Sequence, residues 1–273
     1  MQIRSLKTIN FSEFLAVFLK AFDGYFVKMP TEVDYYRHRW DMAKVDYDLS
    51  FGMFNGDMLV GFIINAVNHR NGHRIAHNTG TGVVPDYRGR QIVDAIYDYA
   101  IPILRKKGVE KCTLEVITKN KVALKVYERI GFTIVKDFKC YDGDINTELG
   151  RTDFKMKKVG MDFFDWNRID QTVYSWDNDI ETLKQGNFEF YAVFNGEAPA
   201  AYFIINPQTN YLAQFDVFEN NAKHWERLFS AMGRVCKTIR TNNVDAMQND
   251  KLFYLKRFGL KNTIDQYQME LNL

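Results

Sequence analysis

The segment Gly82-Val83-Val84-Pro85-Asp86-Tyr87-Arg88-Gly89-Arg90-Gln91-Ile92-Val93, which continues into Asp94-Ala95-Ile96-Tyr97, decides the fold of this chain. An apolar strand end meets a proline, then a basic loop with one glycine, then an amphipathic run. This order predicts a helix N-terminus beside a strand end, where unpaired backbone N–H groups and two arginines attract anions. One interpretation is a site for a phosphate-bearing ligand, and the other is an ordinary strand–turn–helix junction with surface arginines.

The composition is that of a folded globular protein. The chain has 273 residues, of which 46% are apolar and 26% charged, so it can form one large or two ordinary domains with a sizeable core. The net charge of +2 gives no support for a nucleic-acid or membrane-surface partner. No apolar run approaches the roughly 20 residues that span a bilayer.

Cysteine and histidine usage argue against disulfides and metals. The three cysteines are scattered and form no CxxC pair, which favours reduced thiols in a cytoplasmic protein. The segment 1–7 has no signal-peptide core, which agrees with a cytoplasmic location. His69, His73 and His77 have no Cys or carboxylate at ligand spacing, so we expect polar loop or strand-edge positions and no metal.

The first 159 residues read as a mixed α/β sheet of about seven strands. Asn55-Gly56 between apolar runs predicts a hairpin. Helices are expected at about 11–22, 32–45, 92–107 and 121–130. Strands are expected at about 49–54, 58–67, 75–84, 111–117, 132–141 and 152–159. Glu115 is unexpected in its apolar strand, and a solvent-facing edge position is the simplest explanation.

Two motifs in this half resemble the Gcn5-related N-acetyltransferase (GNAT) superfamily. The cofactor motif V-x-P-x-x-R-G-x-G-x-G/A is similar to residues 83–93, although Gln91 and Val93 replace its two later glycines. The motif N-x-x-A-x-x-x-Y-x-x-x-G-F is matched at every position, by Asn120, Ala123, Tyr127, Gly131 and Phe132. The resemblance covers about residues 1–159 and implies the α/β (α+β) GNAT fold, a mixed central sheet with flanking helices.

The resemblance implies acetyl-CoA as co-substrate and direct acetyl transfer to a primary amine. Backbone groups of Gly82 and Val83 would bind the pantetheine and polarise the thioester. Asn120 and Tyr127 complete the expected cofactor site, and the pyrophosphate would lie on the N–H groups of Arg88, Gly89, Arg90, Gln91, Ile92, Val93 and Asp94. The glycines normally allow close backbone approach, but Gln91 and Val93 can still donate N–H groups if their φ and ψ stay helical.

Tyr127 and Glu115 are the candidate catalytic residues. Tyr127 lies at the family's general-acid position, where a phenol can protonate the departing thiolate, and a core aromatic is the alternative. Leu114-Glu115-Val116 is similar to the ribosomal-protein N-terminal acetyltransferases, in which the matching Glu is the base. A structural carboxylate is the alternative for Glu115.

The acceptor is less defined by the sequence. By family analogy, Tyr25 and Phe26 would form an aromatic wall on the acceptor side, although both also suit packing or surface positions. The implied acceptor is a small-molecule amine or a peptide N-terminus.

The second half repeats parts of the first. Phe54-Asn55-Gly56 recurs as Phe194-Asn195-Gly196, and Phe62-Ile63-Ile64-Asn65 recurs one residue later in register as Phe203-Ile204-Ile205-Asn206. Arg129-Ile130-Gly131-Phe132 is similar to Arg257-Phe258-Gly259-Leu260. Three matches in order indicate an internal repeat.

The second copy lacks the residues that carry the chemistry. Residues 219–225 contain no Arg-Gly, and Leu255 stands opposite Tyr127. We therefore predict a catalytic domain over residues 1–159 and a degenerate GNAT-like domain over 160–273, which either covers the acceptor side or forms a homodimer. A non-catalytic acyl-CoA sensor and an acyltransferase for longer acyl-CoA are the functional alternatives.

Overall fold

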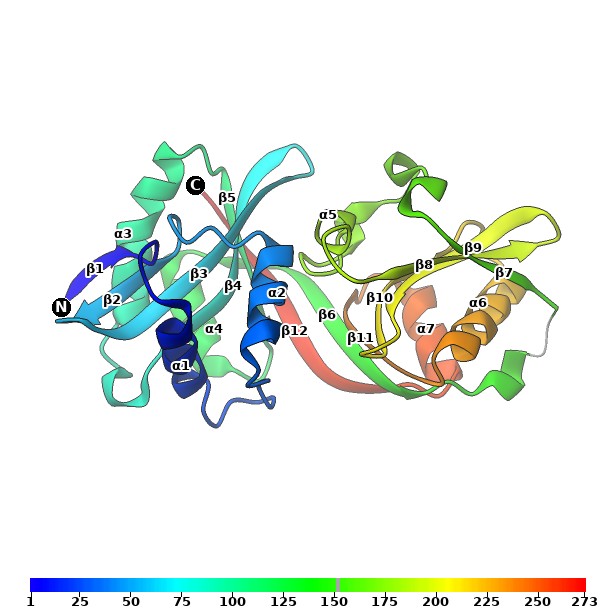
Figure 1. Ribbon diagram of the computed structural model, residues 1–273, viewed down its shortest axis with the longest axis horizontal. Helices are drawn as coiled ribbons and strands as arrows, with labels where there is room; N and C mark the ends of the chain where they lie inside the picture. Colours follow the sequence, from blue (N-terminus) through cyan, green and yellow to red (C-terminus); the bar gives the residue numbers. More distant parts are fainter. Residues whose placement is uncertain (151–152) are drawn as a thin grey trace. The chain divides into compact units, whose positions relative to one another are not determined.

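The computed structural model describes residues 1–150 and 153–273 and divides the chain into two compact units (Figure 1). Unit 1 comprises Met1–Val135 and Tyr267–Leu273, and unit 2 comprises Lys136–Gln266. The C-terminal seven residues thus belong to the unit that the N-terminus begins.

Unit 1 is a mixed sheet with helices on both faces. Its elements are β1 (Gln2–Ser5), α1 (Phe11–Ala21), α2 (Val33–Ala43), β2 (Phe51–Asn55), β3 (Met58–Arg70), β4 (His73–Val83), the 3-10 turn η1 (Pro85–Tyr87), α3 (Ile92–Lys106), β5 (Lys111–Ile117), α4 (Lys121–Ile130), the start of β6 (Thr133–Asp144) and the end of β12 (Lys261–Asn272). The strands follow the order β1-β2-β3-β4-β5-β12-β6. The predicted fold class is confirmed, although the short, partly polar strand β1 was not predicted.

Local sequence explains the main elements of unit 1. The Asn10 side chain accepts hydrogen bonds from the N–H groups of Ser12 and Glu13 and so caps α1. Gly56 has a φ of 61° in the turn that joins β2 to β3, as the Asn-Gly pair predicts. Side chains of β3 alternate between two cores: Ile63 packs with the α3 and α4 residues, whereas Phe62 packs with those of α1 and α2.

The parallel strands β4 and β5 pair over part of their length. Their register runs from Ile75 opposite Lys111 to Asn78 opposite Leu114. At this point β4 carries an irregularity against β3, in which Asn78 and Gly80 pair with consecutive residues and Thr79 is skipped. The Asn78 side chain accepts the Gly80 N–H over 3.1 Å and stabilises the bulge. The remainder of β4 leads into the loop that was singled out from the sequence.

Unit 2 repeats the strands of unit 1, but short helical turns stand in place of α1 and α2. Its elements are the rest of β6, η2 (Thr147–Gly150), β7 (Lys155–Val159), η3 (Met161–Phe163), η4 (Trp166–Arg168), η5 (Gln171–Val173), α5 (Ile180–Leu183), β8 (Glu189–Asn195), β9 (Ala198–Asn206), β10 (Tyr211–Val217), α6 (Ala222–Val235), β11 (Thr238–Asp245), α7 (Asn249–Arg257) and the start of β12. Antiparallel β7-β8-β9-β10 and parallel β10-β11 reproduce β1-β2-β3-β4 and β4-β5.

Strand pairing identifies the start of the second repeat. The strand expected at 152–159 is β7, and residue 152 lies outside the described residues. β7 pairs with β8 in unit 2, as β1 pairs with β2, so it opens the second copy. The compact units divide at Val135 and Lys136, 24 residues before the predicted domain boundary, because the later part of β6 pairs with β11. Assigning catalysis to the first domain stays a prediction.

The hairpin registers correct one repeat match. Gly52 pairs with Phe62 in unit 1, and Ala192 pairs with Tyr202 in unit 2, so Phe62 corresponds to Tyr202 and not to Phe203. The core clusters agree, since Ile63 packs with residues of α3 and α4, and Phe203 packs with residues of α6 and α7. A one-residue slip would place each side chain on the wrong face of the sheet.

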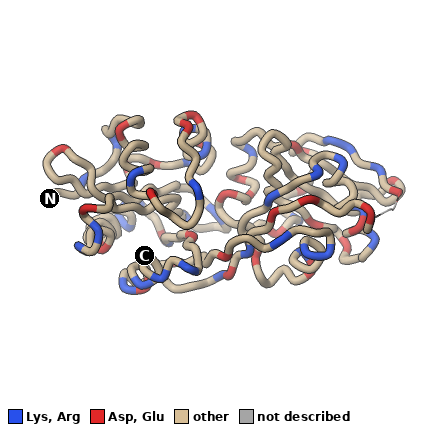
Figure 2. Tube along the Cα trace, turned by 90° about the horizontal axis from the view of Figure 1, so that it is seen from below, with Lys and Arg blue, Asp and Glu red and all other residues tan. Residues whose placement is uncertain are grey.

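Acidic and basic residues are interspersed along both units (Figure 2), in keeping with the net charge of +2. In the described ranges, no helix combines the length and the apolar character that crossing a bilayer requires.

Candidate functional site

A cleft of about 760 Å³ in unit 1 brings the sequence motifs together. Its walls are the C-terminal end of α1 with the following loop, the end of β4, the loop into α3, and α4. The lining residues include the predicted residues Tyr25, Phe26, Gly82, Val83, Arg88, Gly89, Arg90, Gln91, Ile92, Val93, Asp94, Asn120 and Tyr127. The predicted base Glu115 is half-buried on β5, one residue beyond the last β4–β5 pair, and is not among the described lining residues.

Two residues of the loop before α3 have left-handed backbone conformations. Gly89 has a φ of 75°, which a glycine adopts without strain. Gln91 has φ 52° and ψ 32° and is the N-cap of α3. The condition stated for Gln91, that its φ and ψ stay helical, is not met in the right-handed sense, because the loop has a left-handed residue at this point, where the family motif has glycine. For a non-glycine residue, this conformation costs about 1–2 kcal/mol. Val93 lies within the right-handed first turn of α3.

The two arginines of the loop hold its backbone. Arg88 donates to the carbonyl oxygens of Val83 over 3.2 Å and Ala21 over 3.1 Å, which ties the loop to β4 and α1. Arg90 donates to the Asp86 carbonyl over 3.1 Å and lies 4.9 Å from the centre of the Tyr87 ring. Both arginines thus position the loop and also add positive charge at the start of α3.

Gly82 allows the cleft to form. A Cβ atom added there would lie 2.5 Å from the Phe62 ring and 2.8 Å from the Ala21 side chain. A side chain at this position would therefore displace the strand or α1. The absence of a side chain keeps the backbone of Gly82 at the surface of the cleft.

Tyr127 presents its hydroxyl to a buried polar network. The ring is 8% exposed and packs edge-to-face on Phe132 at a centroid distance of 5.8 Å. Burial raises the pKa of Tyr127 to about 12, and a hydrogen bond with the Thr81 side chain acts in the opposite direction. Tyr127 is therefore protonated at neutral pH.

Asn120 and Tyr25 connect α4 to the loop after α1. The Asn120 side chain accepts the Ala123 N–H over 3.1 Å and caps α4, as its sequence position predicts. It also forms a hydrogen bond with Tyr25, whose pKa is raised by burial and partly lowered by this bond. Phe26 is 51% exposed and contacts the Tyr25 ring at a centroid distance of 5.4 Å.

An ion pair that the sequence analysis did not predict links α3 and α4 at the cleft. The Arg129 guanidinium binds both carboxylate oxygens of Asp94, over 2.5 and 2.7 Å. The hydrogen bond from Arg129 lowers the pKa of Asp94. Thr81 also lines the cleft and was not predicted; the motif flanks it without including it. The sequence feature that could have identified Thr81 is its hydroxyl, one residue before Gly82.

The histidines at 73 and 77 contact neighbouring side chains. Among the described residues, no group of three or more His, Cys, Asp or Glu side chains is placed to bind a metal ion. His73 instead contacts the Glu110 carboxylate over 2.9 Å, and His77 contacts the Thr113 hydroxyl over 2.9 Å.

The fold and cleft define an α/β protein with a strand–loop–helix site suited to a phosphate-bearing cofactor. Residues 15–132 match the model of the acetyltransferase (GNAT) family. The matched residues lie in unit 1 and include both motifs, so unit 1 is similar to the GNAT family of acetyltransferases.

Two curated proteins are similar in sequence. An uncharacterised N-acetyltransferase of Methanocaldococcus jannaschii is 32% identical over 136 residues, which is 48% of this chain and 59% of that protein. N-alpha-acetyltransferase 30 of Schizosaccharomyces pombe is 25% identical over 99 residues, covering 36% of this chain and 62% of that protein. The chain thus spans about 60% of the length of these relatives.

Solved structures share the two-unit fold. A tandem GNAT protein from the clavulanic acid biosynthesis pathway matches with a TM-score of 0.69 and 13% identity, over 99% of this chain and 98% of that one. An acetyltransferase candidate from Pyrococcus horikoshii matches with a TM-score of 0.70 and 15% identity, over 100% of this chain and 89% of that one. At these identities the likeness establishes the fold alone.

Proposed function

We propose that unit 1 catalyses direct transfer of an acetyl group from acetyl-CoA to a primary amine. The observation that carries this proposal is the placement of a protonated, buried Tyr127 on the same cleft as the strand end and the α3 N-terminus. The cleft residues fit the cofactor: the backbone of Gly82 lines the cleft, and the loop offers backbone N–H groups and two arginines.

The proposed chemistry divides between the backbone and Tyr127. N–H groups of residues 88–94 bind the pyrophosphate, and backbone groups of Gly82 and Val83 orient the thioester. The neutral amine attacks the carbonyl carbon, the C–S bond breaks, and Tyr127 donates its proton to the departing sulfur. The amine proton leaves to base or solvent, with Glu115 as the proposed base, and Tyr127 is reprotonated.

The raised pKa of Tyr127 is compatible with this role. A thiol in water has a pKa of about 8.5, so a phenol at about 12 is a weak acid toward a hydrated thiolate. Burial also raises the pKa of thiols, and Cys112 in the same unit reaches about 12 for this reason. A sulfur that departs beside the buried Tyr127 is therefore a matched partner for its phenol.

The acceptor side is assigned to the aromatic wall after α1. Tyr25 and Phe26 line the cleft, and Asn120 anchors the Tyr25 hydroxyl. We propose that they contact a small-molecule amine or a peptide N-terminus. The named activity of the Schizosaccharomyces pombe relative favours peptide N-termini as the first acceptors to test.

The test combines acetyl-CoA binding by calorimetry with thiol release on a panel of amines and N-terminal peptides. Tyr127→Phe should lower turnover about 100-fold and leave acetyl-CoA affinity within a factor of two, because the loss concerns proton donation. Tyr99→Phe, on exposed Tyr99 of α3, is the matched control and should keep full activity. Acetyl-CoA binding by the wild type without turnover on any amine would favour a sensor. Faster release from succinyl-CoA would favour a longer donor.

A further inference from the structure

A chain of hydrogen bonds joins Thr81, Asn78 and Tyr97 beside the cleft that Tyr127 lines. Thr81 donates to the Asn78 side-chain oxygen over 3.0 Å, and the Asn78 amide donates to the Tyr97 hydroxyl over 3.1 Å. The Thr81 side chain also lowers the pKa of Tyr97 and of Tyr127 as a hydrogen-bond partner of the ionised phenols, and Thr81 lines the same cleft as Tyr127. Because the Thr81 proton is given to Asn78, the two lone pairs of the Thr81 hydroxyl remain as acceptors for the two phenols.

This network is held rigidly by the fold. Asn78 is 7% exposed, Tyr97 is 1% exposed, and Asn78 also accepts the Gly80 N–H that fixes the bulge in β4. Thr81 itself is half-buried and lines the cleft, so it lies between the buried polar groups and the reacting space. A fully satisfied buried network fixes the positions of its members.

The same architecture folds without these groups in unit 2. The strand registers place Leu212, Phe215 and Asp216 of β10 at the positions of Asn78, Thr81 and Gly82. Leu212, Phe215 and Leu255, which stands opposite Tyr127, are at most 2% exposed and belong to one apolar core. The hydroxyl network is therefore not a requirement of the repeat itself.

We propose that Thr81 is the positioning residue for Tyr127 and stabilises the tyrosinate that forms when Tyr127 gives up its proton. This inference rests on the proposed function. In the step, the Tyr127 O–H bond breaks, an S–H bond forms, and the electron pair stays on the phenol oxygen. Thr81 then turns its O–H from Asn78 toward that oxygen, and solvent returns a proton to Tyr127. Asn78 keeps the Gly80 N–H as a partner throughout.

The kinetic test compares Thr81→Val, which keeps the shape of the side chain, with Thr81→Ser, which keeps the hydroxyl. Thr81→Val should lower kcat about ten-fold with an unchanged acetyl-CoA dissociation constant, and Thr81→Ser should retain most of kcat. In a Tyr127→Phe background, Thr81→Val should have no further effect on kcat. An equal loss of kcat in both backgrounds, or no loss in either, would overturn the proposal.

A second measurement does not depend on turnover. A 3,5-difluorotyrosine at position 127, whose phenol is more acidic than tyrosine, can be titrated by ¹⁹F NMR in the free protein. Loss of the Thr81 hydroxyl should raise its ionisation midpoint by about one pH unit, because the tyrosinate loses a donor. An unchanged midpoint would overturn the role of Thr81 even in an active enzyme. A wild type without turnover but with the shifted midpoint would instead contradict the proposed function alone.

Discussion

The equivalent positions of the two units differ where unit 1 has its cleft. In unit 1 the strand carries Gly82 and the helix carries Ala123, both at the cleft surface. The strand register places Asp216 at the first position, and the repeat spacing places Lys251 at the second. Asp216 and Lys251 form an ion pair of 2.9 Å in unit 2. Two small residues that leave space are thus replaced by a charged pair that bridges strand and helix.

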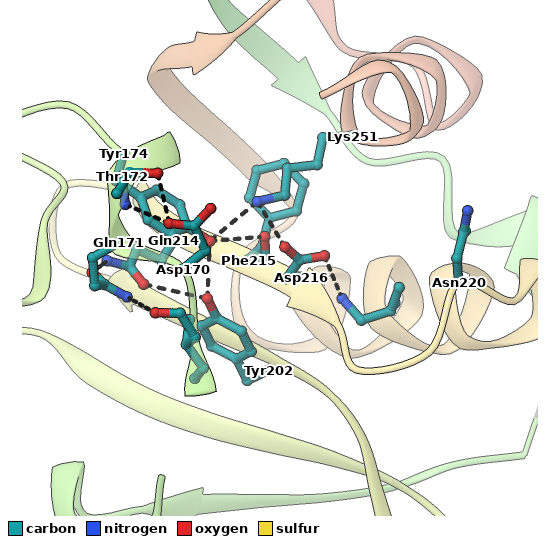
Figure 3. Close-up of polar contacts among 12 residues, drawn as sticks. Asp170, Gln171, Thr172, Tyr174, Tyr202, Gln214, Phe215, Asp216, Asn220 and Lys251 are labelled. Atoms are coloured by element: carbon teal, nitrogen blue, oxygen red, sulfur yellow. Dashed lines mark hydrogen bonds and ion pairs between the residues drawn. The ribbon is translucent and has the colours of Figure 1, made fainter. Parts of the chain in front are cut away.

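A polar network supports this pair in unit 2 (Figure 3). Lys251 is 3% exposed and donates to the Tyr174 hydroxyl over 3.1 Å, while its ammonium lies 4.7 Å from the centre of that ring. Tyr174 in turn contacts the Tyr202 hydroxyl over 2.9 Å, and Tyr202 donates to Gln214 over 3.3 Å. The comparison teaches that one scaffold either keeps a strand–helix gap for a ligand or fills it with its own side chains.

The largest effect is expected from breaking the pair in unit 2. Lys251→Met should lower the free energy of unfolding by about 2–3 kcal/mol, because Asp216 loses its partner, although its 34% side-chain exposure softens the loss. Chemical denaturation followed by tryptophan fluorescence suits the measurement, since Trp166, Trp176 and Trp225 lie in unit 2.

Two further variants control this prediction. Lys256→Met, on an exposed lysine of the same helix, should change stability by less than about 0.5 kcal/mol. Adding Asp216→Asn to Lys251→Met should recover part of the loss, because no charge is then left unpaired. Equal losses for Lys251→Met and Lys256→Met would show that the pair contributes nothing.

The next effect concerns the gap itself in unit 1. Gly82→Ala places a Cβ atom 2.5 Å from Phe62, so it should cost about 1–3 kcal/mol of stability and lower acetyl-CoA affinity at least ten-fold. Calorimetry measures the affinity and urea unfolding the stability. Asp216→Ala, at the equivalent position of unit 2, should leave acetyl-CoA affinity unchanged. Wild-type affinity in Gly82→Ala would refute the role assigned to the gap.

The parts of the molecule that the sequence predicted are those that depend on local sequence patterns. The Asn-Gly turns, the Asn10 and Asn120 caps and the motif spacing depend on nearby residues, so the hairpins, helices and most cleft residues were predictable. The end of β12 in unit 1 was not, because its pairing is remote in sequence: the Leu273 N–H donates to Glu110 over 2.8 Å. No short sequence pattern predicts such a pairing.

The missed site features have the same origin. The left-handed Gln91 follows from the shape of the loop and not from its side chain, and the motif alone suggested a glycine. Thr81 gains its role from the bulge that brings it toward Asn78, and Arg129 from the approach of α4 to α3. Each depends on contacts between elements, which spacing along the chain does not encode.

The smallest effect compares how unit 1 links α3 to α4 with how unit 2 links α6 to α7. Unit 1 uses the bidentate Asp94–Arg129 pair, and unit 2 uses a single contact of 3.6 Å between Glu226 and Arg257, the counterpart of Arg129. Arg129 is half exposed, so Asp94→Asn should cost at most about 1 kcal/mol at neutral pH, and Glu226→Gln about 0.2 kcal/mol. Amide hydrogen exchange of the paired helices measures both.

The pH dependence of this difference identifies its cause. The pKa of Asp94 is lowered in the folded unit, so its contribution is complete above the unfolded value of about 3.9 and is lost as the pH falls through the lower folded value. Wild type and Asp94→Asn should therefore differ at pH 7 and converge once the pH falls below the lowered pKa of Asp94. High salt should reduce the difference in stability between wild type and Asp94→Asn at pH 7, because the ion pair is partly exposed. A difference in stability that persists in acid would show that the effect comes from lost packing or helix capping. The ion pairs of the two units would then contribute equally little to linking their helices.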